Sequence, residues 1–181
     1  ELEHCKSVEF LDLDGSNFSD QHCRFVAVLT KLKTLWIKRT KITDAGMKIL
    51  ATSTSLSAIE CRDTAITDQG VAWICESKSL AFIDLGRTQI TDKSGTFLTK
   101  CPTLTAIVCT GQKVGDDFVA PLAKHENLQL LGLSGTNVSE RSIEYFARMK
   151  SLGGVELDRT QFSGAGYERL KRELPGLRLA P

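Results

Sequence analysis

One spacing dominates this 181-residue chain: an apolar residue opens a near copy of the same unit every 24 residues, with no insertion or deletion between copies. The openers are Val8, Leu32, Leu56, Leu80, Leu104, Leu128 and Leu152. Further apolar residues follow three and five positions after each opener, so the unit begins L-x-x-L-x-L. A fixed period of roughly 20–50 residues is typical of a solenoid, in which each copy buries its apolar face against the next. The spacing therefore predicts one continuous core built from stacked coils.

Each unit contains the pattern of a strand followed by that of a helix. The first six residues alternate around two apolar sites, which is strand periodicity. Later in the unit a hydroxyl residue precedes a carboxylate, as in Thr43-Asp44 and Thr67-Asp68, and this pair favours the start of a helix. We therefore predict an α/β fold, a right-handed superhelix with a parallel sheet of seven or eight short strands on its concave face and helices on its convex face.

The turn between strand and helix carries a polar residue in every unit. These residues are Ser16, Thr40, Thr64, Thr88, Gln112, Thr136 and Thr160. We expect them to bond the backbone of neighbouring coils and so to form a ladder that satisfies buried polar groups. The fifth unit departs most from the pattern, because Gly115 replaces the capping residue and Pro121 falls inside the expected helix. That helix is expected to be shortened or to begin late, and the departure indicates either a functional site or drift in a repeat that binds nothing.

A longer stretch of the second unit resembles a known family. Residues 32–46 read L-x-x-L-x-I-x-x-T-x-I-T-D-A-G, which resembles the leucine-rich repeat, with threonine where many members have asparagine. The I-T-D-x-G runs at 42–46 and 66–70, and C-x-x-L at 101–104, are similar to the cysteine-containing subclass. The resemblance covers essentially the whole chain and implies a leucine-rich repeat solenoid. It names no partner, because the family binds unrelated partners through one scaffold.

The resemblance also bears on the kind of protein. The cysteine-containing subclass occurs in substrate receptors of ubiquitin ligases, and short threonine-bearing repeats are common in bacterial proteins. The chain has no F-box segment, and its uniform 24-residue unit is shorter than the unit usual in those receptors. We therefore expect a 24-residue threonine-bearing variant of bacterial type.

The repeat leaves room for one domain. Residues 1–181 are expected to form a single leucine-rich repeat domain, with residues 1–7 as the tail of a preceding helix or an N-terminal cap and residues 176–181 as a C-terminal end strand. Seven repeats, starting at residues 8, 32, 56, 80, 104, 128 and 152, lie between them. No linker interrupts the repeats, so a second core is not expected.

Charge and cysteine positions limit the partners and the compartment. A net charge of +1, from 23 basic and 22 acidic residues, argues against a nucleic-acid partner. No apolar run is long enough for a membrane span, so no membrane partner is expected. Cys61 and Cys109 hold inward strand positions, and Cys23 matches an apolar helix position. These positions predict reduced core cysteines and a reducing, cytoplasmic compartment.

The residue types that act in catalysis or metal binding do not converge in this sequence. An enzyme needs a convergent nucleophile, base and orienting group, and the pattern contains none, so we predict no enzyme, no catalytic residue, no metal and no cofactor. His4, His22 and His125 lie far apart along the solenoid, and surface or edge positions are expected for them. Four aspartates line up one coil apart and raise the possibility of a cation ladder, but each has a helix start to serve: Asp44, Asp68, Asp92 and Asp116.

The outward strand positions are the candidate binding site. Side chains alternate across a strand, so the neighbours of inward residues form the concave surface. Tryptophan and arginine are enriched among interface hot spots, and both gather in repeats two to four. The candidate partner-binding residues are Phe10, Trp36, Lys38, Arg39, Glu60, Arg62, Phe82, Asp84, Arg87, Val108 and Leu130. The alternative is that Trp36 covers its neighbours while the charges form a solvated lattice.

These observations favour a non-catalytic protein–protein interaction scaffold, monomeric rather than homo-oligomeric, that binds a protein partner on its concave face. One alternative is the recognition segment of a larger multidomain protein, such as a ubiquitin-ligase substrate receptor or a bacterial signalling protein. Another is a structural spacer without a specific ligand. The uneven chemistry of the concave face argues against a spacer, since a spacer needs only a solvated surface.

Overall fold

The computed structural model describes residues 7–180, across which strands and helices alternate. The strands are β1 (Phe10–Asp12), β2 (Thr34–Trp36), β3 (Ala58–Glu60), β4 (Phe82–Asp84), β5 (Ala106–Val108), β6 (Leu130–Gly132), β7 (Gly154–Glu156) and β8 (Arg178–Ala180). They form one parallel, eight-stranded sheet in sequence order. Leu11 pairs with Leu35 and Leu35 with Ile59, an offset of 24 residues at each step. The sequence period is therefore the length of one coil.

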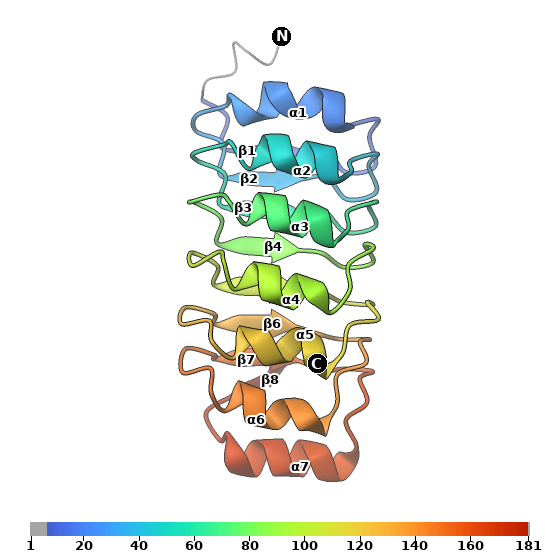
Figure 1. The fold of residues 1–181 in the computed structure, drawn as a ribbon, viewed down its shortest axis with the longest axis vertical. Helices are drawn as coiled ribbons and strands as arrows, with labels where there is room; N and C mark the ends of the chain where they lie inside the picture. The colour runs from blue at the N-terminus through green and yellow to red at the C-terminus, as the bar shows by residue number, and fades with distance from the viewer. Residues whose placement is uncertain (1–6, 181) are drawn as a thin grey trace.

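Helices cover one face of this sheet (Figure 1). They are α1 (Asp20–Ala27), α2 (Asp44–Leu50), α3 (Asp68–Ile74), α4 (Lys93–Leu98), α5 (Asp116–Leu122), the 3-10 turn η2 (Glu140–Ser142) with α6 (Ile143–Phe146), and α7 (Gly164–Glu173). Paired strands lie about 4.8 Å apart, whereas packed helices need about 8–10 Å, so the stack curves with its sheet inside. In Figure 1 the row of helices accordingly extends further than the row of strands. The predicted α/β solenoid is confirmed.

The core runs through successive coils between sheet and helices. The inward residues of the middle strands are fully buried: Leu35, Ile59, Ile83, Ile107 and Leu131. The described cysteines are free and buried: Cys23, Cys61, Cys75, Cys101 and Cys109. For Cys23, Cys61 and Cys109 this confirms the predicted role as small apolar core residues. Cys5 lies outside the described residues.

The turn threonines do not form the predicted ladder between coils. Each hydroxyl donates to a carbonyl in its own coil, as Thr40 does to Ile37 O at 2.7 Å. The prediction was wrong because each turn threonine has a carbonyl of its own coil within reach, three residues earlier, and donates its hydroxyl hydrogen there. The longer Gln112 does reach the preceding coil, where its amide donates to Leu85 O (2.7 Å) and to Thr88 Oγ1 (2.9 Å).

Carboxylates at the helix starts tie successive coils together instead. Asp44 accepts hydrogen bonds from the Thr67 backbone N–H (2.8 Å) and hydroxyl (2.6 Å), and Thr67 caps α3 by accepting from Gln69 N (3.2 Å). A Cβ on Gly70 would overlap Asp44 Oδ1, which explains the glycine of the I-T-D-x-G run. The same bonds join Asp20 to Thr43, Asp68 to Thr91 and Asp116 to Ser139. The sequence predicts that the aspartates serve a helix start. The helix start that their carboxylates bond is that of the next coil.

Helix α5 contradicts the prediction that Pro121 shortens or delays it. It has seven residues, as many as α2 and α3. The proline removes one helical donor, but Phe118, Val119 and Leu122 are fully buried, so packing holds the helix in place. Phe118 stands where neighbouring coils have serine, and a Cβ on Gly95 in the coil before it would overlap Phe118 O. The missing side chain of Gly95 therefore lets the backbone of α5 lie close to α4.

Candidate functional site

The outward strand residues line up in columns on the concave face. Strand pairing places one column at Phe10, Thr34, Ala58, Phe82, Ala106, Leu130 and Gly154, and a second at Asp12, Trp36, Glu60, Asp84, Val108, Gly132 and Glu156. A third set follows the strands, two residues further along each coil: Asp14, Lys38, Arg62, Gly86, Thr110, Ser134 and Asp158. The predicted register of the strip is confirmed by this pairing, whereas its use as a binding site stays a prediction.

Phe10 and Trp36 form an aromatic pair at the N-terminal end of the strip. Their ring centroids lie 4.7 Å apart and their planes are perpendicular, at 90°. Phe10 is 48% exposed, and among the described residues it shares such exposure of a large apolar side chain only with Val28. An edge-to-face pair offers a large apolar area in a fixed geometry. It is the most prominent apolar feature of the concave face.

Lys38 is held over Trp36 by two carboxylates. Its Nζ lies 2.9 Å from Glu60 Oε2, 3.1 Å from Asp14 Oδ2 and 4.8 Å from the centroid of the Trp36 ring. The hydrogen bond to Glu60, and after it the bond to Asp14, raises the pKa of Lys38 against the opposing effect of burial. Lys38 therefore stays protonated at neutral pH and lies against the Trp36 ring as a cation–π partner.

A second ion pair repeats the pattern one coil further on. Arg62 Nε lies 3.5 Å from Asp84 Oδ2. Burial raises the pKa of Asp84, while the hydrogen bond from Gly86 N (2.8 Å) and the charge of Arg62 oppose the rise. A Cβ on Gly86 would lie 2.8 Å from Arg62 Nε, so the glycine leaves the space that Arg62 occupies. As with Lys38 and Glu60, the cation of one coil meets the carboxylate of the next.

Arg39 and Arg87 border the strip instead of lying in its columns. Both occupy the turn after a strand in the left-handed backbone region, with φ of 54° and 52°. The Arg87 side chain is 65% exposed and its nearest carboxylate oxygen, on Asp63, is 3.9 Å away. The same turn position holds Gly15, Gly111 and Gly135, also with positive φ. These glycines are the sequence signal that could have revealed the turn.

The strip is neutral in coils five and six. Phe82 and Leu130 lie in one column with Ala106 between them, and Val108 lies in the next column. Beside Leu130 a shallow hollow of about 520 Å³ opens along Gln129, Gly153, Gly154, Gly176 and Arg178. The structure therefore brings the predicted residues of coils one to four together as one charged and aromatic surface. It leaves Val108 and Leu130 on a separate, neutral one.

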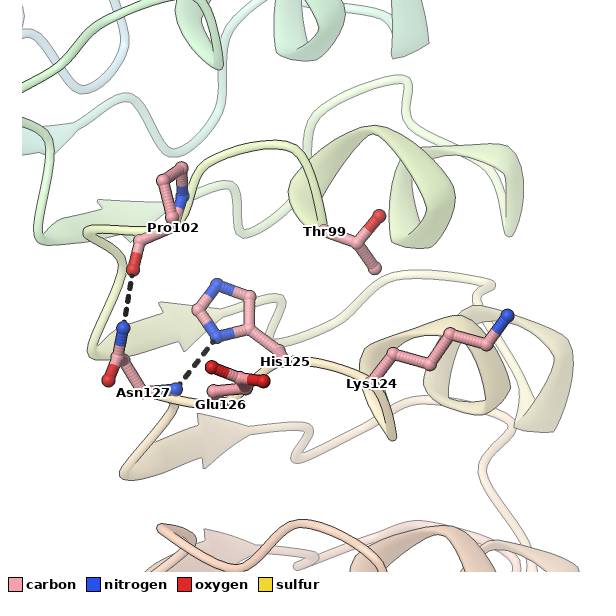
Figure 2. Close-up of a pocket in the computed structure, with 6 residues that line it drawn as sticks. All are labelled: Thr99, Pro102, Lys124, His125, Glu126 and Asn127. Carbon is pink, nitrogen blue, oxygen red and sulfur yellow. Dashed lines mark hydrogen bonds between the residues drawn. The ribbon is translucent and has the colours of Figure 1, made fainter.

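A smaller hollow, of about 190 Å³, lies between the loops that follow α4 and α5, and Figure 2 shows the residues that line it. Its lining is Thr99, Pro102, Lys124, His125, Glu126 and Asn127. His125 is buried: its Nε2 lies 3.0 Å from Cys101 O, and Asn127 N donates to its Nδ1 at 3.3 Å. The expected edge position holds, but the expected exposure was wrong, because His125 takes the buried place that Cys101 holds one coil earlier. The ring is a structural part of the loop.

Two further observations concern metals and membranes. Within residues 7–180, no group of three or more His, Cys, Asp or Glu side chains is placed to hold a metal ion. His4 lies outside that range. No helix of the described chain is long and apolar enough to cross a membrane.

Comparisons with known proteins identify the fold. No protein-family model matches the chain, and a comparison with curated proteins finds no match. A solved internalin (inlF) of Listeria monocytogenes matches 99% of this chain with a TM-score of 0.69 at 18% sequence identity, and 55% of that internalin is covered. Internalin C2 of the same organism matches 96% of this chain, with 81% of its own length covered, a TM-score of 0.62 and 19% identity.

Both neighbours are leucine-rich repeat proteins, and the described fold is that of a leucine-rich repeat solenoid. At such identities the likeness shows the fold alone. The chain spans about half the length of the first internalin. The 24-residue threonine-bearing subclass and the bacterial type stay predictions.

Proposed function

We propose that this chain is a non-catalytic, monomeric scaffold that binds a protein partner on its concave face. One observation carries the proposal: Phe10, 48% exposed, is packed edge-to-face on Trp36, and Lys38 is fixed against the same ring. Aromatic anchors in a fixed geometry supply much of the affinity of protein interfaces. Because these side chains are already ordered, less rotamer freedom is lost on binding.

The charges around the aromatic pair favour a particular division of roles. Lys38 is paired with Asp14 and Glu60, and Arg62 is paired with Asp84, all within the face. A charge that is satisfied in the free protein gains little from a partner's counter-ion. We therefore expect the ion pairs to orient Trp36 and to select against mismatched charges, while the rings of Phe10 and Trp36 supply most of the affinity.

The sequence also predicts two alternative functions, a recognition segment of a longer protein and a structural spacer. The chain covers 55% of the internalin (inlF), which is compatible with a recognition segment of a longer protein. A structural spacer predicts that no concave substitution changes any interaction. The free, buried cysteines of the described residues support a reducing, cytoplasmic compartment, and the proposal assigns no cofactor.

The test is affinity capture of partners from an extract of the source organism, followed by measurement of Kd with the purified partner. Wild type is compared with Trp36→Ala and with Trp73→Ala, which removes the same side chain from the convex face, where Lys48 covers it at 4.2 Å. Loss of the aromatic anchor Trp36 is expected to raise Kd about 30-fold or more, whereas Trp73→Ala leaves it nearly unchanged.

The variants must remain folded, which circular dichroism and thermal unfolding verify. A partner held equally by wild type and Trp36→Ala would move the site to the convex face or to the neutral part of the strip, in coils five and six. If wild type captures no partner and no concave substitution changes any interaction, the structural spacer is the preferred hypothesis.

A further inference from the structure

Beyond the concave face, a row of cations follows the edge where the helices end and the chain returns to the sheet. Lys100, Lys124 and Arg148 each stand two residues after the last residue of α4, α5 and α6, and Arg172 holds the same register in the last turn of α7. The backbone N–H groups of the first three donate to the carbonyls three residues earlier, at 3.0, 3.2 and 3.1 Å. Because the local backbone is the same, the side chains leave successive coils at equivalent places.

These cations are exposed and largely without counter-ions. Lys100, Lys124, Arg148 and Arg172 are all exposed, as is the neighbouring Lys150. Of these five cations, Arg148 alone forms an ion pair with a described residue. Its Nη2 lies 3.6 Å from Glu144 Oε2, and both side chains are more than half exposed. Such an exposed pair contributes little. The row is therefore free to interact with an external anion.

The helix dipole does not account for the row. Cations near helix C-termini are favoured by the carbonyl ends of the helix, and α1, α2 and α3 have the same ends. In those coils, however, the register holds Val28, Thr52 and Glu76. At this register the cations are thus confined to the last four coils, although the dipole is common to all. The register of Lys150 also carries the exposed Lys78, in coil three.

The edge is also hollowed between coils. A hollow of about 450 Å³ between coils five and six is lined by Lys124, His125, Glu126, Arg148, Lys150 and Ser151, among others. It adjoins the hollow of Figure 2, in which Lys124 points away from the buried ring of His125. An acidic side chain has room to enter between the two loops and to meet three cations there.

We infer that this edge, formed by Lys100, Lys124, Arg148, Lys150 and Arg172 and called here the basic edge, binds an acidic segment of a partner protein. A nucleic-acid backbone fits less well, since Glu126 stands among the cations and the whole chain has a net charge of only +1. A peptide can place a neutral residue opposite Glu126, whereas an evenly charged phosphate backbone cannot. The basic edge does not depend on the concave site.

The experiment measures binding of a labelled peptide of about six Glu-Ser pairs, which spans about 40 Å when extended and so reaches across four coils. Fluorescence anisotropy gives Kd between about 0.05 M and about 0.5 M salt, where binding to exposed cations weakens steeply. The Lys124→Glu, Arg148→Glu variant is expected to bind at least about tenfold more weakly.

The matched control is Lys41→Glu, Lys113→Glu, which changes net charge equally at exposed positions on the opposite edge of the coils. This control is expected to keep Kd within about twofold of wild type, because screening confines the effect to nearby charges. If the glutamate variant fails to fold, Lys124→Gln, Arg148→Gln is expected to weaken binding at least about threefold. The inference is wrong if wild type does not bind the peptide, if the control loses as much affinity as the edge variant, or if an oligonucleotide of equal charge binds more tightly than the peptide.

Discussion

Asp68 shows at the residue scale how one side chain joins two coils. Its Oδ1 accepts the Thr91 backbone N–H at 2.8 Å, its Oδ2 accepts the Thr91 hydroxyl at 2.6 Å, and Ser94 adds a further bond. Burial favours the neutral acid, but the bonds from Ser94 and Thr91 outweigh it, and the pKa of Asp68 falls below its ordinary value. The ionised carboxylate is therefore part of the folded structure.

The Asp68→Asn variant tests this link through pH. A carboxyl group whose pKa is lowered by folding stabilises the folded state above its unfolded pKa of about 3.9, and that contribution is lost as pH falls through the folded pKa. Above about pH 5 the free energy of unfolding of wild type should exceed that of the variant by a constant amount. In acid this difference between the two free energies should become small. Urea unfolding of both proteins across this range gives the difference. Asp117→Asn, at a carboxylate that is 70% exposed, is the control with a smaller difference, and a gap independent of pH would contradict the assignment.

At the element scale, α4 and α5 depend on the close approach of Gly95 to the Phe118 backbone. A Cβ on Gly95 would overlap the carbonyl oxygen of Phe118. At the equivalent position α3 and α6 carry larger apolar residues, Val71 and Ile143. Phe118, like Val119 and Leu122, is fully buried. The burial of these side chains agrees with the full length of α5 despite Pro121, because tertiary packing stabilises short helices more than propensity does.

Gly95→Ala is expected to lower the free energy of unfolding by about 1–3 kcal/mol, the usual cost of an overpacked core. The added Cβ meets a backbone oxygen, which cannot move aside without shifting α5. Gly153→Ala is the control, since its Cβ would lie 3.8 Å from Gln129 O, an ordinary contact. Chemical unfolding of the two variants decides the matter: equal costs would mean that α4 and α5 are not as closely packed as described.

At the scale of the whole molecule, each strand pairs only with its neighbours in sequence, from β1 to β8. Within residues 7–180 no strand returns to close the sheet. The stability of a coil therefore depends on the coils beside it. The inward residues of the middle coils therefore hold the stack together. This arrangement also lets the concave strip and the basic edge vary from coil to coil without disturbing the core.

Leu85→Asp tests this dependence. Leu85 is fully buried in a middle coil, and an unpaired carboxylate at this place carries a large desolvation cost. We expect amide hydrogen exchange to lose protection first in β3 to β5 and their helices, with global unfolding at much lower denaturant than wild type. The exposed substitution Lys41→Asp should leave protection unchanged. Full protection in Leu85→Asp would mean that the assigned register is wrong.

The sequence by itself determined the coil length, the strand register and which residues are inward, because a period of 24 and the alternation of a strand leave only one set of apolar residues to share a core. The concave candidates Phe10, Trp36 and Glu60 follow from the same alternation. Only the tertiary structure decided how the coils are joined. Asp44 accepts hydrogen bonds from the next coil, whereas the Thr40 hydroxyl donates to a carbonyl of its own coil. Lys38 forms ion pairs with two carboxylates, those of Asp14 and Glu60. These choices depend on side-chain length, on the gap between coils and on the direction of each bond. A periodic sequence repeats the residues but does not specify these distances.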